Sequence, residues 1–290
     1  SGFDLLHPNE QSRLQPDAVI FQRQIYEYQV KRMRQTRKFL KSFMVFELDD
    51  LITNVPVKSL HRNEIPADTV RWLREATRLC DRFIVSTESL AQAMRGYNDD
   101  IRVVPNRLDS QRWGGLRAMR NQGQKPRVGW AGSVSHSGDL ELIVDVVKEL
   151  ADEVDWVFLG MCPEFLRPYV RDFHPGVPFE QYPAKLANLG LDLALAPLEL
   201  NAFNESKSNL KLLEYGVLGY PVICTDITPY QCNLPVLRVK NRFRDWVAAI
   251  RDSLADRDAL GRKGAELRQV VLDQWMLDDH CAEWLAAWLP

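Results

Sequence analysis

The sequence has no long apolar run, no closely paired cysteines and almost no net charge. No apolar stretch approaches the roughly 20 residues that a membrane-spanning helix needs, and no secretion signal is recognisable. The five cysteines are scattered without a C-x-x-C pair, which indicates reduced thiols rather than a disulfide framework. A net charge of -2 argues against a dedicated nucleic-acid binder, which would carry a basic surface. We therefore expect a cytoplasmic protein whose partners are small molecules or proteins, and not nucleic acid.

The chain contains instead short apolar runs that alternate with longer amphipathic stretches. Its hydrophobic content of 46% is ordinary for a globular protein. In the first part we expect strands at 17–22, 44–48, 82–86 and 101–105, and helices at 24–41, 67–80 and 88–95. Because strands that alternate with helices form parallel β-α-β units, this pattern predicts an α/β fold.

A polar segment rich in glycine and arginine separates this part from a second part with the same alternation. There we expect strands at 127–131, 156–159, 191–196, 221–224 and 236–239, and helices at 139–150, 163–173, 209–218 and from 243 to 289. The prediction is an α/β protein of two Rossmann-like, doubly wound domains. We place an N-terminal domain at 1–109, a linker at 110–125, a C-terminal domain at 126–264, and helices at 265–290 that pack back toward the first domain. The N-terminal domain is short for its kind, and we expect it to be reduced or incomplete.

The first candidate site is the glycine-containing loop after the strand at 127–131. Gly129, Gly132 and Ser133 precede a predicted helix, and His136 follows them closely. Glycines let a backbone approach a phosphate group, and a helix N-terminus favours negative charge. The alternative is an ordinary tight turn between a strand and a helix, with a surface histidine that has no role.

The second candidate site is the predicted helix near 209–218. Lys207, Lys211 and Glu214 are spaced at i, i+4 and i+7, which places them on one helical face. Two lysines on one face repel each other unless an anion binds between them, and a carboxylate beside them can accept hydrogen bonds from ribose hydroxyls. The alternative is a solvated face on which Lys211 pairs with Glu214.

The segment around this second site resembles a known family. Residues 208–223, SNLKLLEYGVLGYPVI, resemble the donor-site helix and following strand of retaining GT-B glycosyltransferases of the family-four type (glycosyl transferases group 1). Residues 81–87, 103–109 and 128–132 are similar to further strands and the glycine loop of that family. In the family, two glutamates are separated by seven residues, whereas here Ser206 occupies the position of the first glutamate and Glu205 lies one residue earlier.

The resemblance implies a hexosyltransferase-like enzyme that moves a sugar from a nucleotide-diphosphate sugar to an acceptor hydroxyl, with retention of configuration. By this resemblance, Glu214 holds the ribose, while Lys207, Lys211 and the loop at 129–133 hold the pyrophosphate. His136 is expected to reach a phosphate or a sugar hydroxyl. The nucleotide sugar is the donor substrate, and no other cofactor is implied. The acceptor is expected to be a glycan, a lipid-linked molecule or a protein.

Three alternatives remain open from the sequence. The chain is either an enzyme or a non-catalytic module that binds a nucleotide sugar or a partner within a larger glycosyltransferase. The acidic segment 47–50 resembles the Asp-x-Asp metal motif of the other glycosyltransferase fold, but parallel strands on both sides of the linker favour GT-B, so we expect no metal. The basic run 31–38 either contacts anionic lipid, which would place the protein at the inner face of the membrane, or forms a solvated helix face.

Overall fold

The computed structural model describes residues 13–119, 121 and 123–290 and contains two parallel β-sheets. The first sheet consists of β1 (Ala18–Gln22), β2 (Phe43–Leu48), β3 (Arg82–Val85) and β4 (Ile101–Val103). The second consists of β5 (Arg127–Gly132), β6 (Asp155–Gly160), β7 (Val170–Pro175), β8 (Leu193–Ala196), β9 (Val222–Thr225) and β10 (Leu237–Val239). Residues 1–12 of the expected N-terminal domain, and 120 and 122 of the expected linker, lie outside the described residues.

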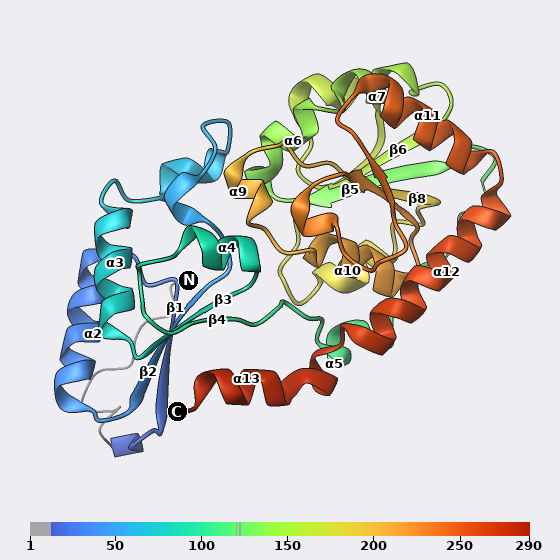
Figure 1. Cartoon of the computed structure of the whole chain (residues 1–290). Coiled ribbons are helices and arrows are strands. Elements are labelled where there is room, and N and C mark those ends of the chain that lie inside the picture. The colour runs from blue at the N-terminus through green and yellow to red at the C-terminus, as the bar shows by residue number, and fades with distance from the viewer. Residues whose placement is uncertain (1–12, 120, 122) are drawn as a thin grey trace.

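The strands of the first sheet lie in simple chain order, β1-β2-β3-β4. Because right-handed crossovers that all advance in one direction leave their helices on one side, α2 (Glu27–Phe39), α3 (Thr69–Leu79) and α4 (Glu88–Ala93) share one face (Figure 1). Strand β2 alternates accordingly: Met44 and Phe46 enter the core under these helices, while Val45 faces the opposite side. This half is Rossmann-like, but helices from its own crossovers cover only one of its faces.

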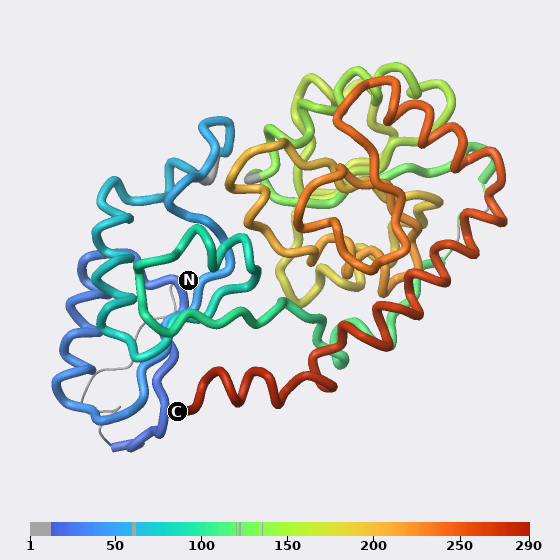
Figure 2. Tube along the Cα trace, in the orientation of Figure 1, coloured from blue at the N-terminus to red at the C-terminus, as the bar shows by residue number. Residues whose placement is uncertain are grey.

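The second face of this sheet is covered by the other end of the chain. Helix α13 (Cys281–Trp288) packs Ala287 against Val45 and Ile84. The buried Arg82 donates hydrogen bonds of 3.1, 2.9 and 2.7 Å to the carbonyls of residues 286, 287 and 289, which satisfies the end of this helix. Figure 2 shows the C-terminal segment leaving the second half and ending beside the strands of the first.

The second sheet has the order β10-β9-β8-β5-β6-β7. Strands β6 and β7 lie on one side of β5, and β8, β9 and β10 lie on its other side, so the strand order reverses between β5 and β8. Alternating residues of each strand enter two cores, as in β6, where Trp156 and Phe158 face one side and Val157 and Leu159 the other. On the latter side lie α10 (Leu210–Leu218) and α12 (Arg257–Gln274), which meet at Gly216, where an added Cβ would come within 2.9 Å of Leu267. Open α/β sheets bind ligands at the carboxyl ends of their strands, beside such a reversal.

Two predicted helices differ from the structure, and a third is confirmed. The segment 163–173 forms a short 3-10 helix and then strand β7, because Phe173 and its neighbours pair with β6. The helix expected at 139–150 is broken into α6 (Ser137–Glu141) and α7 (Val144–Glu149). The helix expected at 209–218 is confirmed as Leu210–Leu218, and Lys207 lies before it.

The remaining helices complete the second half and the connection. They are α5 (Ser110–Trp113), α8 (Tyr182–Ala187), α9 (Ala202–Glu205) and α11 (Phe243–Leu254). Within the described part of the chain, no helix is both long enough and apolar enough to span a bilayer.

Candidate functional site

A small cleft of about 190 Å³ lies between the two sheets, where the carboxyl ends of β2 and of the second sheet face each other. It is lined by Asp49, Asp50, Asn106, His136, Lys207, Ser208, Leu210, Lys211, Glu214 and Tyr230. Four of the predicted site residues therefore come together in one cleft, from segments far apart in the sequence.

Lys211 and Glu214 form an ion pair of 2.9 Å inside this cleft. Their side chains are only 18% and 13% exposed, so the pairing foreseen in the alternative interpretation occurs, but not on a solvated face. Burial alone would lower the pKa of Lys211, and the neighbouring Glu214 raises it above its ordinary value. The lysine is therefore charged, and it neutralises Glu214.

Tyr182, which the sequence did not single out, belongs to the same group. Its hydroxyl donates to Glu214 Oε2 at 3.0 Å, and Lys211 Nζ lies 3.3 Å from the Tyr182 oxygen. Burial and the Glu214 charge raise the pKa of Tyr182 well above its ordinary value, so the phenol keeps its proton. No sequence signal connects Tyr182 with Glu214, because α8 and α10 meet only in the folded chain.

Lys207 lies in the loop between α9 and α10 rather than on a shared helical face. The backbone there contacts the first half: Thr87 donates a 2.8 Å hydrogen bond to the Ser206 carbonyl, and Asn106 donates one of 3.0 Å to Ser208. The Lys207 ammonium lies 4.9 Å from the centre of the Phe203 ring. Lys207 therefore does not share a helical face with Lys211, contrary to the prediction from their spacing, although both lysines line one cleft.

Helix α10 adds backbone donors to the same wall. Asn209 is its N-cap residue, yet no side chain of the described residues caps this helix end. The Asn209 amide instead points to Cys232, with a nitrogen–sulfur distance of 3.8 Å. An uncapped helix N-terminus beside two lysines is suited to a phosphate group.

His136 is fixed by a buried carboxylate. Its Nδ1 lies 2.7 Å from Asp139 Oδ2, and Oδ1 of the same carboxylate accepts hydrogen bonds from the Glu199 amide at 2.7 Å and from Asn204 at 2.8 Å. Burial lowers the pKa of His136, the hydrogen bond to Asp139 opposes this, and Lys207 lowers it further. The sequence did not identify Asp139, although its spacing of three residues from His136 is a recognisable helical pair.

The three residues of the glycine loop occupy different environments. Gly129 lies inside β5, where a Cβ would come within 2.5 Å of Leu191 and 2.9 Å of the Val157 carbonyl. Its small size is therefore required by packing, and its position gives no support to the predicted phosphate contact. Gly132 and Ser133 lie at the carboxyl end of β5, immediately before the turn that carries His136.

The opposite wall of the cleft is acidic. Asp50 contacts Arg23 at 3.4 Å, whereas no described residue donates a side-chain hydrogen bond to the Asp49 carboxylate. Burial and the adjacent Asp50 raise the pKa of Asp49. Among the described residues, no group of three or more histidines, cysteines and acids is arranged to hold a metal ion.

The position of the family's first glutamate contributes no carboxylate here. Ser206 is 4% exposed, and its hydroxyl donates to the Ala202 carbonyl at 2.9 Å. Glu205 ends α9 and is not among the residues that line the cleft. Neither Ser206 nor Glu205 therefore supplies the cleft with the carboxylate that the first glutamate provides in the family.

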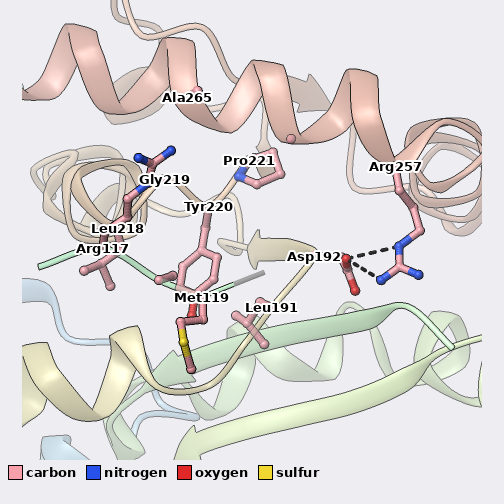
Figure 3. Close-up of a pocket in the computed structure, with 12 residues that line it drawn as sticks. Arg117, Met119, Leu191, Asp192, Leu218, Gly219, Tyr220, Pro221, Arg257 and Ala265 are labelled. Carbon is pink, nitrogen blue, oxygen red and sulfur yellow. Dashed lines mark hydrogen bonds and ion pairs between the residues drawn. The ribbon is translucent and has the colours of Figure 1, made fainter. Parts of the chain in front are cut away.

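A second pocket lies at the amino ends of β8 and β9 (Figure 3). Its buried acid, Asp192, pairs with Arg257 at 2.8 Å and accepts hydrogen bonds from Asn121 and from the Arg127 amide. Because every lone-pair direction of this carboxylate is engaged, the cluster is best explained as a contact that holds the linker and α12 on the sheet.

The basic run 31–38 is largely neutralised within the fold. Lys31 pairs with Glu27, Arg34 contacts Glu75, and Arg37 binds Asp81 with two hydrogen bonds of 2.8 and 2.7 Å. Paired charges of this kind leave little excess potential to attract anionic lipid. The structure gives no support to the lipid contact, which was one of the two alternatives that the sequence left open for this run.

Comparison with known proteins identifies the fold. No protein-family model and no curated protein sequence matches the chain. Among solved structures, Staphylococcus aureus TarM matches at 14% identity with a TM-score of 0.68, over 98% of this chain and 57% of TarM. Anabaena HepE in complex with UDP and glucose matches at 11% identity with a TM-score of 0.67, over 97% of this chain and 81% of HepE.

A third match is an α-glucosyltransferase in complex with UDP and a 13-mer DNA that contains an HMU base. It has 10% identity and a TM-score of 0.67, over 97% of this chain and 83% of the other. These likenesses confirm that the chain has the GT-B fold with Rossmann-like halves. The chain spans little more than half the length of TarM.

Proposed function

We propose that the protein is a glycosyltransferase that binds a nucleotide-diphosphate sugar in the cleft between its two sheets and transfers the sugar to an acceptor hydroxyl. The observation that carries this proposal is the convergence of His136, Lys207, Lys211 and Glu214 on one wall of the cleft. Two ammonium groups and free helix amides would stabilise charge that grows on the leaving diphosphate. Glu214, held by Lys211 and Tyr182, would accept hydrogen bonds from the ribose.

Two neighbours of the same fold support this proposal, because HepE and the α-glucosyltransferase were solved with UDP. From the family resemblance we further propose a hexose as the transferred group, retention of configuration, and a glycan, lipid-linked or protein acceptor. We also propose that lysines rather than a metal balance the diphosphate charge, and that no other cofactor takes part. The domain boundaries and the cytoplasmic location given above remain predictions.

The test is binding followed by turnover. Calorimetric titration with UDP, GDP, ADP and their glucose or mannose conjugates should identify a nucleotide that binds. Sugar release or transfer from that donor should then be measured by nucleotide release in the presence of simple glycan acceptors. If no nucleotide or nucleotide sugar binds, the proposal is wrong.

The second candidate function is a non-catalytic module that binds a nucleotide sugar. It is favoured by the environment of Ser206, which leaves the cleft without the first glutamate of the family. Binding without donor hydrolysis or transfer to any acceptor would support this function over the first.

A further inference from the structure

The strongest unexplained feature of the cleft is the second ring nitrogen of His136. Nδ1 faces the Asp139 carboxylate, which receives three hydrogen bonds in all. An ionised carboxylate only accepts hydrogen bonds, so the proton of the neutral ring must be on Nδ1. Nε2 is then an unprotonated nitrogen, and no described residue forms a hydrogen bond with it.

The surroundings of the ring set its charge. The side chain is 17% exposed, and the edge of the ring packs against Trp130 with 6.0 Å between centroids. Two ammonium groups, those of Lys207 and Lys211, act on it from the loop before α10 and from α10 itself. Burial lowers the pKa of His136, and both lysines add to this effect against the opposing Asp139.

The other charged groups of the cleft do not change this balance. Glu214 is already paired with Lys211. Asp49 and Asp50 lie on the opposite wall, and Asp50 contacts Arg23. The carboxylate of Glu199, whose amide holds Asp139, contacts Lys58 at 3.4 Å.

We propose that His136 is a proton-linked ligand of the diphosphate: its ring is neutral before binding and takes up one proton at Nε2 when a diphosphate binds beside Lys207 and Lys211. This inference rests on the proposed function and adds a mechanism of regulation by pH. The bound anion cancels the positive potential of the two lysines. Asp139 then stabilises the cationic ring on one side, and the new Nε2–H donates a charge-assisted hydrogen bond to a phosphoryl oxygen on the other. The proton comes from solvent, and no covalent bond is changed.

The coupling must work in both directions. If diphosphate binding raises the pKa of His136, protonation of His136 must strengthen diphosphate binding by the same factor. A rise of about one pKa unit corresponds to about tenfold tighter binding at low pH. Affinity should therefore increase as the pH falls through the bound-state pKa, and level off below the free-state pKa.

The test uses the full chain and NMR detection of histidine ring C–H groups. The chain has five histidines, and the His136 resonance is identified by its loss in His136→Gln. Titration without ligand should give a midpoint below the ordinary value of about 6.5, and saturation with UDP-glucose should move the midpoint above that value. Inorganic pyrophosphate is the second probe, since it carries the diphosphate without base or sugar.

Two controls separate this inference from the proposed function. His174 lies in β7 outside the cleft, and its midpoint should not respond to either probe. His136→Gln should remain folded by circular dichroism, and its affinity for UDP-glucose, whose two phosphoryl groups are both esterified, should lose the increase between pH 8 and pH 6. Binding of UDP-glucose with an unchanged His136 midpoint overturns this inference alone. Failure of pyrophosphate and of every nucleotide and nucleotide sugar in the calorimetric series to bind at any pH overturns the proposed function together with it.

Discussion

The hydroxyl of Tyr182 and the carboxylate of Glu214 are joined by a 3.0 Å hydrogen bond that ends on Oε2. Lys211 binds the same oxygen at 2.9 Å, and no described residue forms a hydrogen bond with Oε1. A carboxylate that is held by one oxygen and open at the other is prepared to receive a pair of sugar hydroxyls. Tyr182 thus positions Glu214 without being part of the cleft lining itself.

Replacing Tyr182 by phenylalanine should weaken nucleotide binding. The change removes one donor from Glu214, which is worth about 0.5–1.5 kcal/mol, so affinity should fall about twofold to tenfold with little change in melting temperature. Calorimetric titration with the nucleotide that binds the natural chain measures this. Tyr26→Phe is the matched control, because it also removes one hydrogen bond, to the Glu64 carbonyl, but far from the cleft. Equal effects of the two changes would contradict the role of Tyr182.

Replacing Lys207 by alanine should weaken diphosphate binding more than it changes stability. Among the described residues, its ammonium contacts the Phe203 ring. A hydrogen bond to a charged group contributes about 1.5–3 kcal/mol. We expect a loss of affinity of about tenfold or more and a weaker dependence of binding on salt. Lys263→Ala, an exposed position on α12, should leave both quantities unchanged. A Lys207→Ala chain that binds as tightly as the natural one would remove Lys207 from the site.

Replacing Gly129 by alanine should destabilise the fold rather than block a phosphate contact. The added Cβ meets Leu191 and the Val157 carbonyl, and overpacking of this kind costs about 1–3 kcal/mol. Urea unfolding should show the loss, while the folded fraction should bind nucleotide with unchanged affinity. Gly115→Ala is the control, because nothing lies within 4 Å of its added Cβ. Full stability with lost binding would show instead that Gly129 acts on the ligand.

Asp81 should contribute to stability against acid. Burial alone would raise its pKa, but hydrogen bonds from Arg37 and from the Met44 amide lower it below the ordinary value. A depressed pKa gives stability that is present above the unfolded-state pKa and is lost as the pH falls through the folded-state pKa. Asp81→Asn should therefore be less stable at pH 7 and lose less stability between pH 4 and pH 2. Unfolding curves at several pH values test this, with the exposed Asp152→Asn as the unaffected control.

A charge at Ala287 should detach α13 from the first sheet. Ala287 is 3% exposed and packs on Val45 and Ile84, so Ala287→Asp would bury an unpaired carboxylate at a cost of about 1–3 kcal/mol or more. We expect a lower melting temperature and faster proteolysis near the C-terminus. Ala282→Asp, at an exposed position of the same helix, should behave like the natural chain. Unchanged proteolysis of Ala287→Asp would show that α13 is not needed to cover this face.

The strands and their burial were largely predictable from the sequence because a short apolar run is a local signal. Segments such as 44–48 and 156–159 are nearly continuous apolar runs, as expected of parallel strands that are buried on both faces, and both segments form strands near the predicted bounds. The GT-B fold was predicted from the segment 208–223 and is confirmed. The wrong helix predictions arose where the local sequence pattern was ambiguous. The apolar residues of 163–173 suit a helix or a strand, and only pairing with β6 decided for a strand.

Composition and spacing alone determined that this protein is an α/β chain with lysines and a carboxylate near one strand end. Only the tertiary structure decided what these groups do, because their electrostatic state depends on neighbours that are distant in the chain. Tyr182 and Lys211 fix Glu214, Asp139 fixes the His136 ring, and Thr87 holds the loop that carries Lys207. The sequence shows which residues carry charge. The burial and the hydrogen-bond partners of each side chain, however, are set only when the two sheets face each other, and these determine its pKa and its orientation.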